Sequence, residues 1–338
     1  MALVILTVTL NPAYDLTYRL PKFEYGAVQR IPALEQRVGG KGINVARVLT
    51  QLGHDCVAMG FADAAFAEEA GRELPVDIVT ALPRVRRTVV ISEADGTTTG
   101  LWEPGATLDD PHAADVLRQR IADRLPRARG LVISGSLPGG VDPRLPADLA
   151  KLAIAADVPV ICDVDGPALI AAAKVSGVVL MPNEDELQTL TGFPARSAQD
   201  VVDTVQPSLK SGVGAIIATR GRDGLVGAVR GAAWSAAPSE SVTGNPTGAG
   251  DAAAAALIAG LAALPKIPRD FPAQLEWPNV VLPGWLRAPE LDWPALLADV
   301  VATSAAAVAR PVAGEIDMDL RTALIPEVRL LPVHNWLY

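Results

Sequence analysis

The chain of 338 residues is poor in the residue types that build metal centres and disulfide frameworks. It has two cysteines, Cys56 and Cys162, far apart in the sequence, and three scattered histidines. Their spacing matches no zinc-binding pattern. So few cysteines favour a reducing compartment, and we expect the protein to be cytoplasmic.

Positive charge and long apolar runs are also lacking. The formal net charge of −9 argues against nucleic acid as a partner, because phosphate backbones require a basic face. The most apolar run, 252–264, has 13 residues and is too short for a bilayer span of about 20 residues. It predicts a buried helix and no membrane contact. The N-terminal stretch lacks the basic start and the cleavage site of a signal peptide, and it is typical of a β-strand.

Short β-branched runs alternate with amphipathic stretches along most of the chain. This alternation predicts an α/β fold, in which a mostly parallel sheet is covered by helices on both faces. The expected strands are 2–10, 130–134, 158–164, 177–181 and 214–219. The expected helices are 42–52, 109–124, 145–156, 184–192, 197–211, 249–263 and 293–309.

Three segments interrupt this alternation. Residues 13–37 and 85–103 have the character of strands joined by turns, and they predict a small β-layer beside the main sheet. The stretch 264–292 is rich in proline and tryptophan and predicts an irregular insertion between two helices. No repeat or low-complexity linker divides the sequence, so we expect a single domain over residues 1–338.

The stretch "TGAGD" (247–251) places an acid where a glycine-rich turn enters a helix. Glycines and the N–H groups of the helix start favour binding of a negatively charged group. The carboxylate of Asp251 can take a proton from a nearby hydroxyl, so the pair indicates phosphoryl transfer to an alcohol. Asp251 is alternatively a simple capping acid. "GAGDAA" also resembles a dinucleotide-binding motif, but that motif should directly follow a strand and "SESVTGNPT" precedes it here.

A second glycine cluster, "VGGKGINVARVL" (38–49), has a similar design. Gly39 and Gly40 precede a helix with an apolar stem, and Lys41 and Asn44 stand near its start. This arrangement indicates either a polar ligand-binding end or a tight turn before a core helix.

Together the two clusters resemble the pfkB/ribokinase-type carbohydrate kinases, especially the branch of 1-phosphofructokinase and tagatose-6-phosphate kinase. The similarity extends over nearly the whole chain, through "TLNPAYDLTY" (9–18), "GGKGINVARVLTQLG" (39–53), "SGSLPGG" (134–140), "DVDGPAL" (163–169), "MPNEDEL" (181–187), "TRGRDG" (219–224) and "TGAGDA" (247–252). The resemblance implies a ribokinase-like three-layer α/β/α sandwich with ATP and Mg²⁺ as cofactors. Segments 13–37 and 85–103 would form a lid over the sugar that also serves some relatives as a homodimer interface.

The resemblance also implies roles for individual residues around the acceptor. Asp251 would be the catalytic base, and the backbone N–H groups of Gly248, Ala249 and Gly250 would form the anion hole. Carboxylate, glycine, lysine and amide groups would line the sugar pocket: Asp15, Gly39, Gly40, Lys41 and Asn44.

The phosphate already carried by the acceptor needs cations and hydroxyls. Arg86 or Arg87 aligns with the lid arginine of the family, and Arg86 is preferred. Ser136 would also bind this phosphate, with help from Lys41. The arginine pair is alternatively a solvated strand edge.

The nucleotide side of the site is implied by two further motifs. Asn183 and Glu186 would act through water on Mg²⁺, which keeps most of its waters in protein sites. An ordinary helix cap at Asn183 is compatible with that role. Thr219, Gly221 and Gly224 would pack against ATP.

Three residues depart from the family pattern: Met181 replaces a common lysine, Asp165 a serine and Thr88 an asparagine. These departures spare the base and the anion hole, but they leave the identity of the sugar undecided. The prediction is an ATP- and Mg²⁺-dependent kinase of a hexose phosphate, such as fructose 1-phosphate, fructose 6-phosphate or tagatose 6-phosphate. The alternatives are a kinase of an unphosphorylated sugar or nucleoside, an NAD-dependent oxidoreductase and a non-catalytic sugar-phosphate sensor.

Overall fold

The computed structural model describes residues 3–265 and 282–333, and their largest feature is a ten-stranded sheet. Seven neighbouring strands are parallel: β5 (Val76–Thr80), β4 (Cys56–Ala62), β1 (Val4–Thr9), β8 (Ala128–Ser134), β9 (Val160–Asp163), β10 (Val179–Leu180) and β11 (Ala215–Thr219). Three antiparallel strands extend one edge: β12 (Leu225–Val229), β13 (Ala232–Ala237) and β14 (Arg329–Pro332). The mostly parallel sheet is therefore confirmed.

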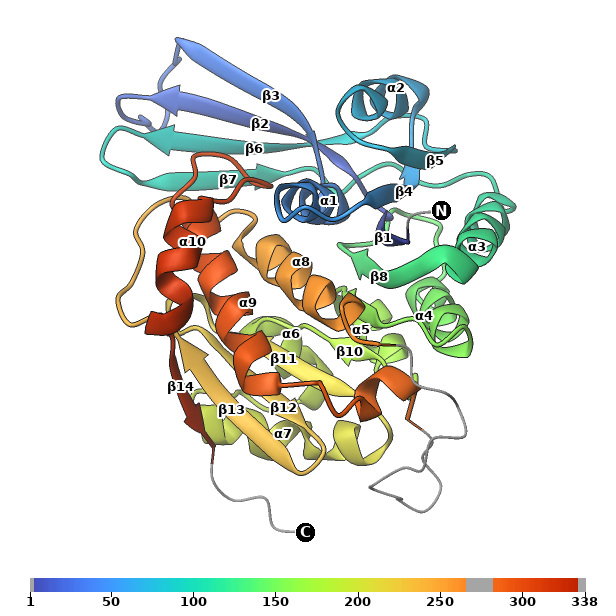
Figure 1. Cartoon of the computed structure of the whole chain (residues 1–338). Coiled ribbons are helices and arrows are strands. Elements are labelled where there is room, and N and C mark those ends of the chain that lie inside the picture. Colours follow the sequence, from blue (N-terminus) through green and yellow to red (C-terminus); the bar gives the residue numbers. More distant parts are fainter. Residues whose placement is uncertain (1–2, 266–281, 334–338) are drawn as a thin grey trace.

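Helices cover both faces of this sheet, so the molecule has three layers (Figure 1). One face carries α1 (Lys41–Gln51), α2 (Ala64–Glu73), α8 (Ala249–Ala262) and α9 (Trp293–Val308), with α10 (Met318–Leu324) against α9. The other face carries α3 (Ala113–Arg124), α4 (Leu145–Ala155), α5 (Gly166–Ala172), α6 (Glu184–Thr191) and α7 (Ala198–Lys210). Alternate residues of β1 enter the two cores: Leu6 and Val8 face one layer and Ile5 faces the other.

All five strands and seven helices expected from the sequence are present, with ends shifted by up to four residues. The alternation pattern did not predict several elements, namely β4, α2, β5, α5, β12, β13, α10 and β14.

A separate four-stranded sheet lies beside the large one, next to α1 and α2 (Figure 1). Its order is β3 (Ala33–Gly39), β2 (Ala13–Leu20), β6 (Arg86–Glu93) and β7 (Thr98–Trp102), and only its central pair, β2 and β6, is parallel. The ring of Tyr14 packs edge-on against Phe66 of α2, with 5.3 Å between ring centroids. The small sheet predicted from 13–37 and 85–103 is thus present.

The expected insertion at 264–292 falls largely outside the described residues. Its described end contains a short 3₁₀ turn, Gly284–Arg287. Within residues 3–265 and 282–333, the structure contains no helix with the length and apolar character needed to cross a membrane.

Candidate active site

The start of α8 combines a glycine with positive φ, a glycine that faces open space and a buried acid. Gly248 caps the helix at φ +85°, and a Cβ there would lie 2.8 Å from the Cβ of Ala313. A Cβ on Gly250 would meet nothing within 4 Å. The N–H of Ala249 donates to the carbonyl of Pro246 at 3.2 Å, so the chain itself already engages one of the three expected anion-hole donors. Because Gly250 has no side chain and faces open space, a ligand can approach its backbone closely.

Asp251, in the first turn of α8, has only 5 % of its surface exposed. Its Oδ2 accepts a hydrogen bond of 2.9 Å from Nδ2 of Asn44. Burial raises the pKa of Asp251 to about 7, with smaller upward contributions from Asp163 and Asp15, while Lys41 and the Asn44 bond act in the opposite direction. A carboxyl group with this pKa is close to the optimum for general-base catalysis at neutral pH.

The start of α1 lies against α8 and is crowded. A Cβ on Gly39 would lie 2.0 Å from Oδ2 of Asp15, and Gly40, at φ +107°, would clash with Thr9. Nζ of Lys41 forms a 2.9 Å ion pair with Oδ1 of Asp163. Burial alone would lower the pKa of Lys41, but Asp163, Glu186 and Asp251 outweigh it and raise the pKa. The lysine is therefore held as a cation between three carboxyl groups.

Asp15 shares one face of the small sheet with Arg86 and Thr88. The parallel register pairs Ala13 with Arg86 and Asp15 with Thr88, whereas Arg87 points to the opposite face and is exposed. Oγ1 of Thr88 donates to Oδ1 of Asp15, so the threonine that departs from the family pattern contacts the predicted sugar-binding acid. Burial raises the pKa of Asp15 despite this bond.

Arg86 is half-buried, and burial lowers its pKa while Asp15 and Asp165 act to raise it. Its Nη1 donates to the carbonyl of Glu103 at 3.1 Å. Within the described part of the chain, its buried Nε has no hydrogen-bond partner. The arginine consequently keeps donor capacity, and it lies on the same face as Asp15.

Ser136 lies in the loop after β8. Its Oγ accepts a hydrogen bond of 3.1 Å from Nδ2 of Asn11, which follows β1 and is buried. Because a hydroxyl that accepts one bond can still donate its own proton, Ser136 can bind a phosphate oxygen in this arrangement.

The predicted nucleotide side is built at the ends of β10 and β11. Asn183 and Glu186 form a reciprocal capping box at the start of α6, with both bonds at 2.9 Å. The N–H of Thr219 donates to the carbonyl of Pro182, which holds the two strand ends together. Burial raises the pKa of Glu186, Asp163 and Asp165 raise it further, and Lys41 opposes them.

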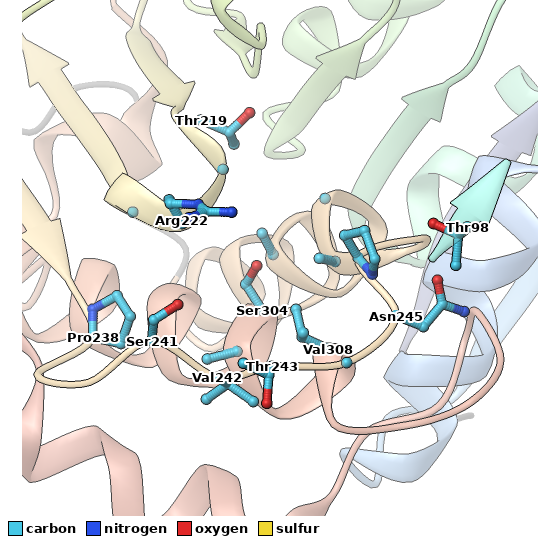
Figure 2. A pocket seen from close by; sticks show the side chains of 18 of the residues that line it. Thr98, Thr219, Arg222, Pro238, Ser241, Val242, Thr243, Asn245, Ser304 and Val308 are labelled. Atoms are coloured by element: carbon cyan, nitrogen blue, oxygen red, sulfur yellow. The ribbon is translucent and has the colours of Figure 1, made fainter. Parts of the chain in front are cut away.

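A cavity of about 1140 Å³ connects this region with the start of α8. Six predicted site residues line it: Asn183, Thr219, Gly221, Gly224, Ala249 and Gly250. Figure 2 shows further side chains facing it that were not predicted, among them Arg222, Thr243 and Ser304. Arg222 belongs to the quoted motif "TRGRDG", so only its role was missed, whereas the helix pattern of α9 gave no signal for Ser304.

The predicted residues thus form two groups that meet at α8. Gly250 faces the cavity, while the side chain of the next residue, Asp251, turns toward Asn44, one of the residues predicted to bind the acceptor. Asp163 was not predicted as a site residue, although it lies in the quoted motif "DVDGPAL". In the described ranges, three or more His, Cys, Asp or Glu side chains nowhere form a metal-binding cluster.

The structure does not meet the requirement of the dinucleotide-binding alternative. That motif needs a strand directly before the glycines. Here β13 ends at Ala237 and α8 begins at Ala249, with a loop between them.

Sequence comparison identifies the relatives of this chain. The profile of the pfkB family carbohydrate kinases matches residues 8–271. The 1-phosphofructokinase of Xanthomonas campestris pv. campestris is 33% identical over 275 residues, which cover 78% of this chain and 84% of the relative. The 1-phosphofructokinase of Rhodobacter capsulatus is 34% identical over 268 residues, with 76% and 84% covered. The tagatose-6-phosphate kinase of Staphylococcus epidermidis is 27% identical over 265 residues, with 76% and 85% covered.

Structural comparison gives the same relationship. Phosphofructokinase-2 from Escherichia coli, in complex with substrates and products, has a TM-score of 0.80 and 25% identity, with 96% of this chain and 98% of that chain covered. Ribokinase from Arabidopsis thaliana has a TM-score of 0.68 and 18% identity, with 96% and 99% covered, which shows the ribokinase-like fold. The profile match and these relatives lead to one conclusion: the chain belongs to the pfkB family of carbohydrate kinases and is a sugar kinase.

Proposed function

We propose that the protein transfers the γ-phosphoryl group of ATP to a hydroxyl of a hexose phosphate, with Asp251 as the general base. The observation that carries this proposal is a buried carboxyl group with a pKa of about 7 beside a glycine that opens onto a large cavity. The named relatives, 1-phosphofructokinases and a tagatose-6-phosphate kinase, support a phosphorylated ketohexose as acceptor.

The acceptor binds between the small sheet and the starts of α1 and α8. Asp15 accepts hydrogen bonds from sugar hydroxyls, and Gly39 allows its carboxylate to lie close to α1. Arg86 binds the phosphate already present on the sugar, with donors that include its Nε, which has no partner among the described residues. Ser136 and Lys41 complete this group.

Asp251 removes the proton of the attacking hydroxyl as its oxygen forms a bond to the γ-phosphorus and the bond to the bridging oxygen breaks. The hydrogen bond from Asn44 keeps the carboxylate turned toward the acceptor. Backbone N–H groups of Gly248 and Gly250, together with the positive end of α8, stabilise the charge on the transferred group.

The donor occupies the cavity along Asn183, Thr219, Gly221 and Gly224. The surroundings of Glu186 fit a hydrated cation, because two further carboxyl groups, Asp163 and Asp165, lie near its own. Asn183 and Glu186 would hold Mg²⁺ through water, consistent with the few protein ligands this ion requires. When bound, Mg²⁺ neutralises charge on the donor phosphates.

The small sheet serves as the lid of this site and as a homodimer interface in our proposal. Apolar side chains are exposed on it, including Leu34, Leu101 and Trp102, the last with 72% of its surface exposed. Light scattering coupled to size exclusion tests the interface: Trp102→Ser should shift the protein toward the monomer. A monomeric wild-type protein at micromolar concentration would contradict it.

A phosphoryl-transfer screen with Mg-ATP tests the proposed function. The acceptor panel contains fructose 1-phosphate, fructose 6-phosphate, tagatose 6-phosphate, the free ketohexoses, ribose and a nucleoside. We expect turnover with a ketohexose phosphate. Preferential turnover of an unphosphorylated acceptor would identify the alternative kinase, and binding of a sugar phosphate without transfer would identify a sensor. Binding of NADH measured by its fluorescence, without binding of Mg-ATP, would overturn the proposal.

A further inference from the structure

Arg47 is a buried cation on α1, one turn after Asn44, with 5% of its surface exposed. Burying a charge is costly unless partners satisfy it. The main partner is Glu73 of α2: Nη2 and Nε of Arg47 lie 2.6 and 3.2 Å from its Oε2. The remaining terminal nitrogen, Nη1, donates to Oδ1 of Asn44 at 3.4 Å. The guanidinium therefore links the outer helix α2 to a residue of the candidate active site.

The amide of Asn44 has a carbonyl end and an NH₂ end, and each faces a different partner. Oδ1 accepts from Arg47, while Nδ2 donates to Oδ2 of Asp251 at 2.9 Å. Because a guanidinium carries only donors, it selects the carbonyl end of the amide. The NH₂ end is thereby left for Asp251.

The backbone of Gly314 also packs against this pair. A Cβ there would lie 3.1 Å from Cδ of Arg47 and 3.2 Å from Oδ1 of Asn44. This close packing leaves both side chains little freedom to reorient. A continuous series of hydrogen bonds therefore connects α2 to α8, through Glu73, Arg47, Asn44 and Asp251.

We propose that Arg47 is a positioning residue that fixes the amide of Asn44 in the orientation that donates to Asp251, and that Glu73 holds Arg47 in place. The inference rests on the proposed role of Asp251 as the base. Arg47 touches Asn44 rather than the reacting atoms, so its hydrogen-bonded route to Asp251 passes through the amide, while its charge also acts on Asp15.

The consequence can be measured as a shift in the pH dependence of activity. Asp251 faces Asp15 from β2, Asp163 from β9, and Lys41 and Asn44 from α1. Donation by Asn44 favours the carboxylate form, so a released amide favours the protonated form. The base must be deprotonated to work. Loss of the Arg47 contact should therefore move the acid limb of kcat/KM to higher pH.

Arg47→Met tests this, because methionine keeps an unbranched apolar stem and removes every donor. We expect the acid limb of kcat/KM for the acceptor to move up by roughly half to one pH unit. Activity at pH 7 should fall about 2–6-fold, because a smaller fraction of Asp251 is then deprotonated, with the KM for ATP unchanged. The matched control is Arg72→Gln on α2, which removes an exposed ion pair with Glu68 and should leave the limb in place.

Glu73→Gln provides a second variant if Arg47→Met fails to fold, because the side chain of Glu73 is 40% exposed. Its weaker acceptor should produce a smaller shift in the same direction. An acid limb that stays at its wild-type position in the folded variants overturns the inference, whatever happens to the rate. Asp251→Asn tests the premise separately: near wild-type turnover of this variant would remove Asp251 from the role of base, on which the inference rests.

Discussion

Helices α1 and α8 begin in the same way but use their glycines for different purposes. Each follows a glycine with positive φ, at Gly40 and Gly248, and neither cap residue makes a side-chain bond to the helix. At α1 the neighbouring glycine, Gly39, is pressed against a carboxylate, and Gly40 is pressed against the chain itself. At α8, Gly250 faces empty space that belongs to the cavity. Glycine thus permits close packing at Gly39, Gly40 and Gly248, whereas Gly250 leaves open space beside the cavity.

The two starts also carry opposite charge. The first residue of α1 is Lys41, which is paired with Asp163, whereas the first turn of α8 carries Asp251. Because the helices pack together, the acid lies beside an amide and a cation from the other helix. The electrostatic environment of Asp251 therefore depends on both helices and not on α8 alone.

Asp251→Asn should have the largest effect on this pair. We expect turnover to fall by about 10²–10⁴-fold, the range for a lost general base, with binding of both substrates largely intact. Steady-state kinetics and calorimetric binding measure the two quantities. Asp292→Asn, which changes an exposed acid at the start of α9, is the matched control and should leave turnover unchanged. Equal turnover of the two variants would reduce Asp251 to a capping residue.

Arg86→Ala tests the acceptor group on the α1 side. The KM for a phosphorylated sugar should rise about 10–100-fold, since a charge-assisted hydrogen bond contributes about 1.5–3 kcal/mol. The KM for its unphosphorylated parent should change far less. Arg87→Ala, on the opposite face of β6, is the control and should alter neither value. A parallel rise for both sugars would show that Arg86 does not bind the phosphate.

Gly250→Ala and Gly40→Ala should separate the two uses of glycine. A methyl at 250 meets nothing within 4 Å and gains helix propensity, so the free energy of unfolding should rise by up to about 1 kcal/mol. The KM for ATP should nevertheless increase several-fold, because the methyl enters the cavity. A methyl at position 40 would clash with Thr9, and alanine is strained at the positive φ of this position, so Gly40→Ala should lower the free energy of unfolding. Chemical denaturation and kinetics check both, and a destabilised Gly250→Ala would refute the contrast.

The wild-type pH profile should show the smallest effect. With its pKa near 7, Asp251 is about half protonated at pH 7 and active only as the carboxylate. The acid limb of kcat/KM should therefore have its midpoint near pH 7, with activity present above it and lost as the pH falls. A midpoint close to 4, the usual range of an aspartate, would contradict the buried environment.

The sequence predicted those parts of the fold that local pattern determines. The parallel strands at the centre are buried on both faces, so their apolar runs are nearly continuous. β4 was missed because Gly60 interrupts its run, at a point where a Cβ would lie 1.9 Å from the carbonyl oxygen of Thr9. α5 and α10 have seven residues each, too few to show a clear helical period.

For the site, the sequence predicted which residues take part but few of the hydrogen bonds between them. Asp251 and Asn44 are 207 positions apart, and Thr88 and Asp15 are 73 apart, so no local spacing encodes either bond. The hydrogen bond from the N–H of Ala249 to the carbonyl of Pro246 depends on the conformation of a turn, which the residue types alone do not specify. The roles of the predicted residues in binding and catalysis stay predictions, to be tested by the variants above.

The small sheet also contributes Thr17, Val90 and Thr98 to the wall of the cavity that Thr219 and Gly250 line. The small sheet therefore borders the cavity and also carries Asp15 and Arg86. A sugar that shifts the equilibrium position of this sheet must alter the affinity for nucleotide, and thermodynamic linkage requires nucleotide to alter the affinity for sugar by the same factor. Cooperative binding of sugar and nucleotide in this enzyme would then require no structural element other than the small sheet.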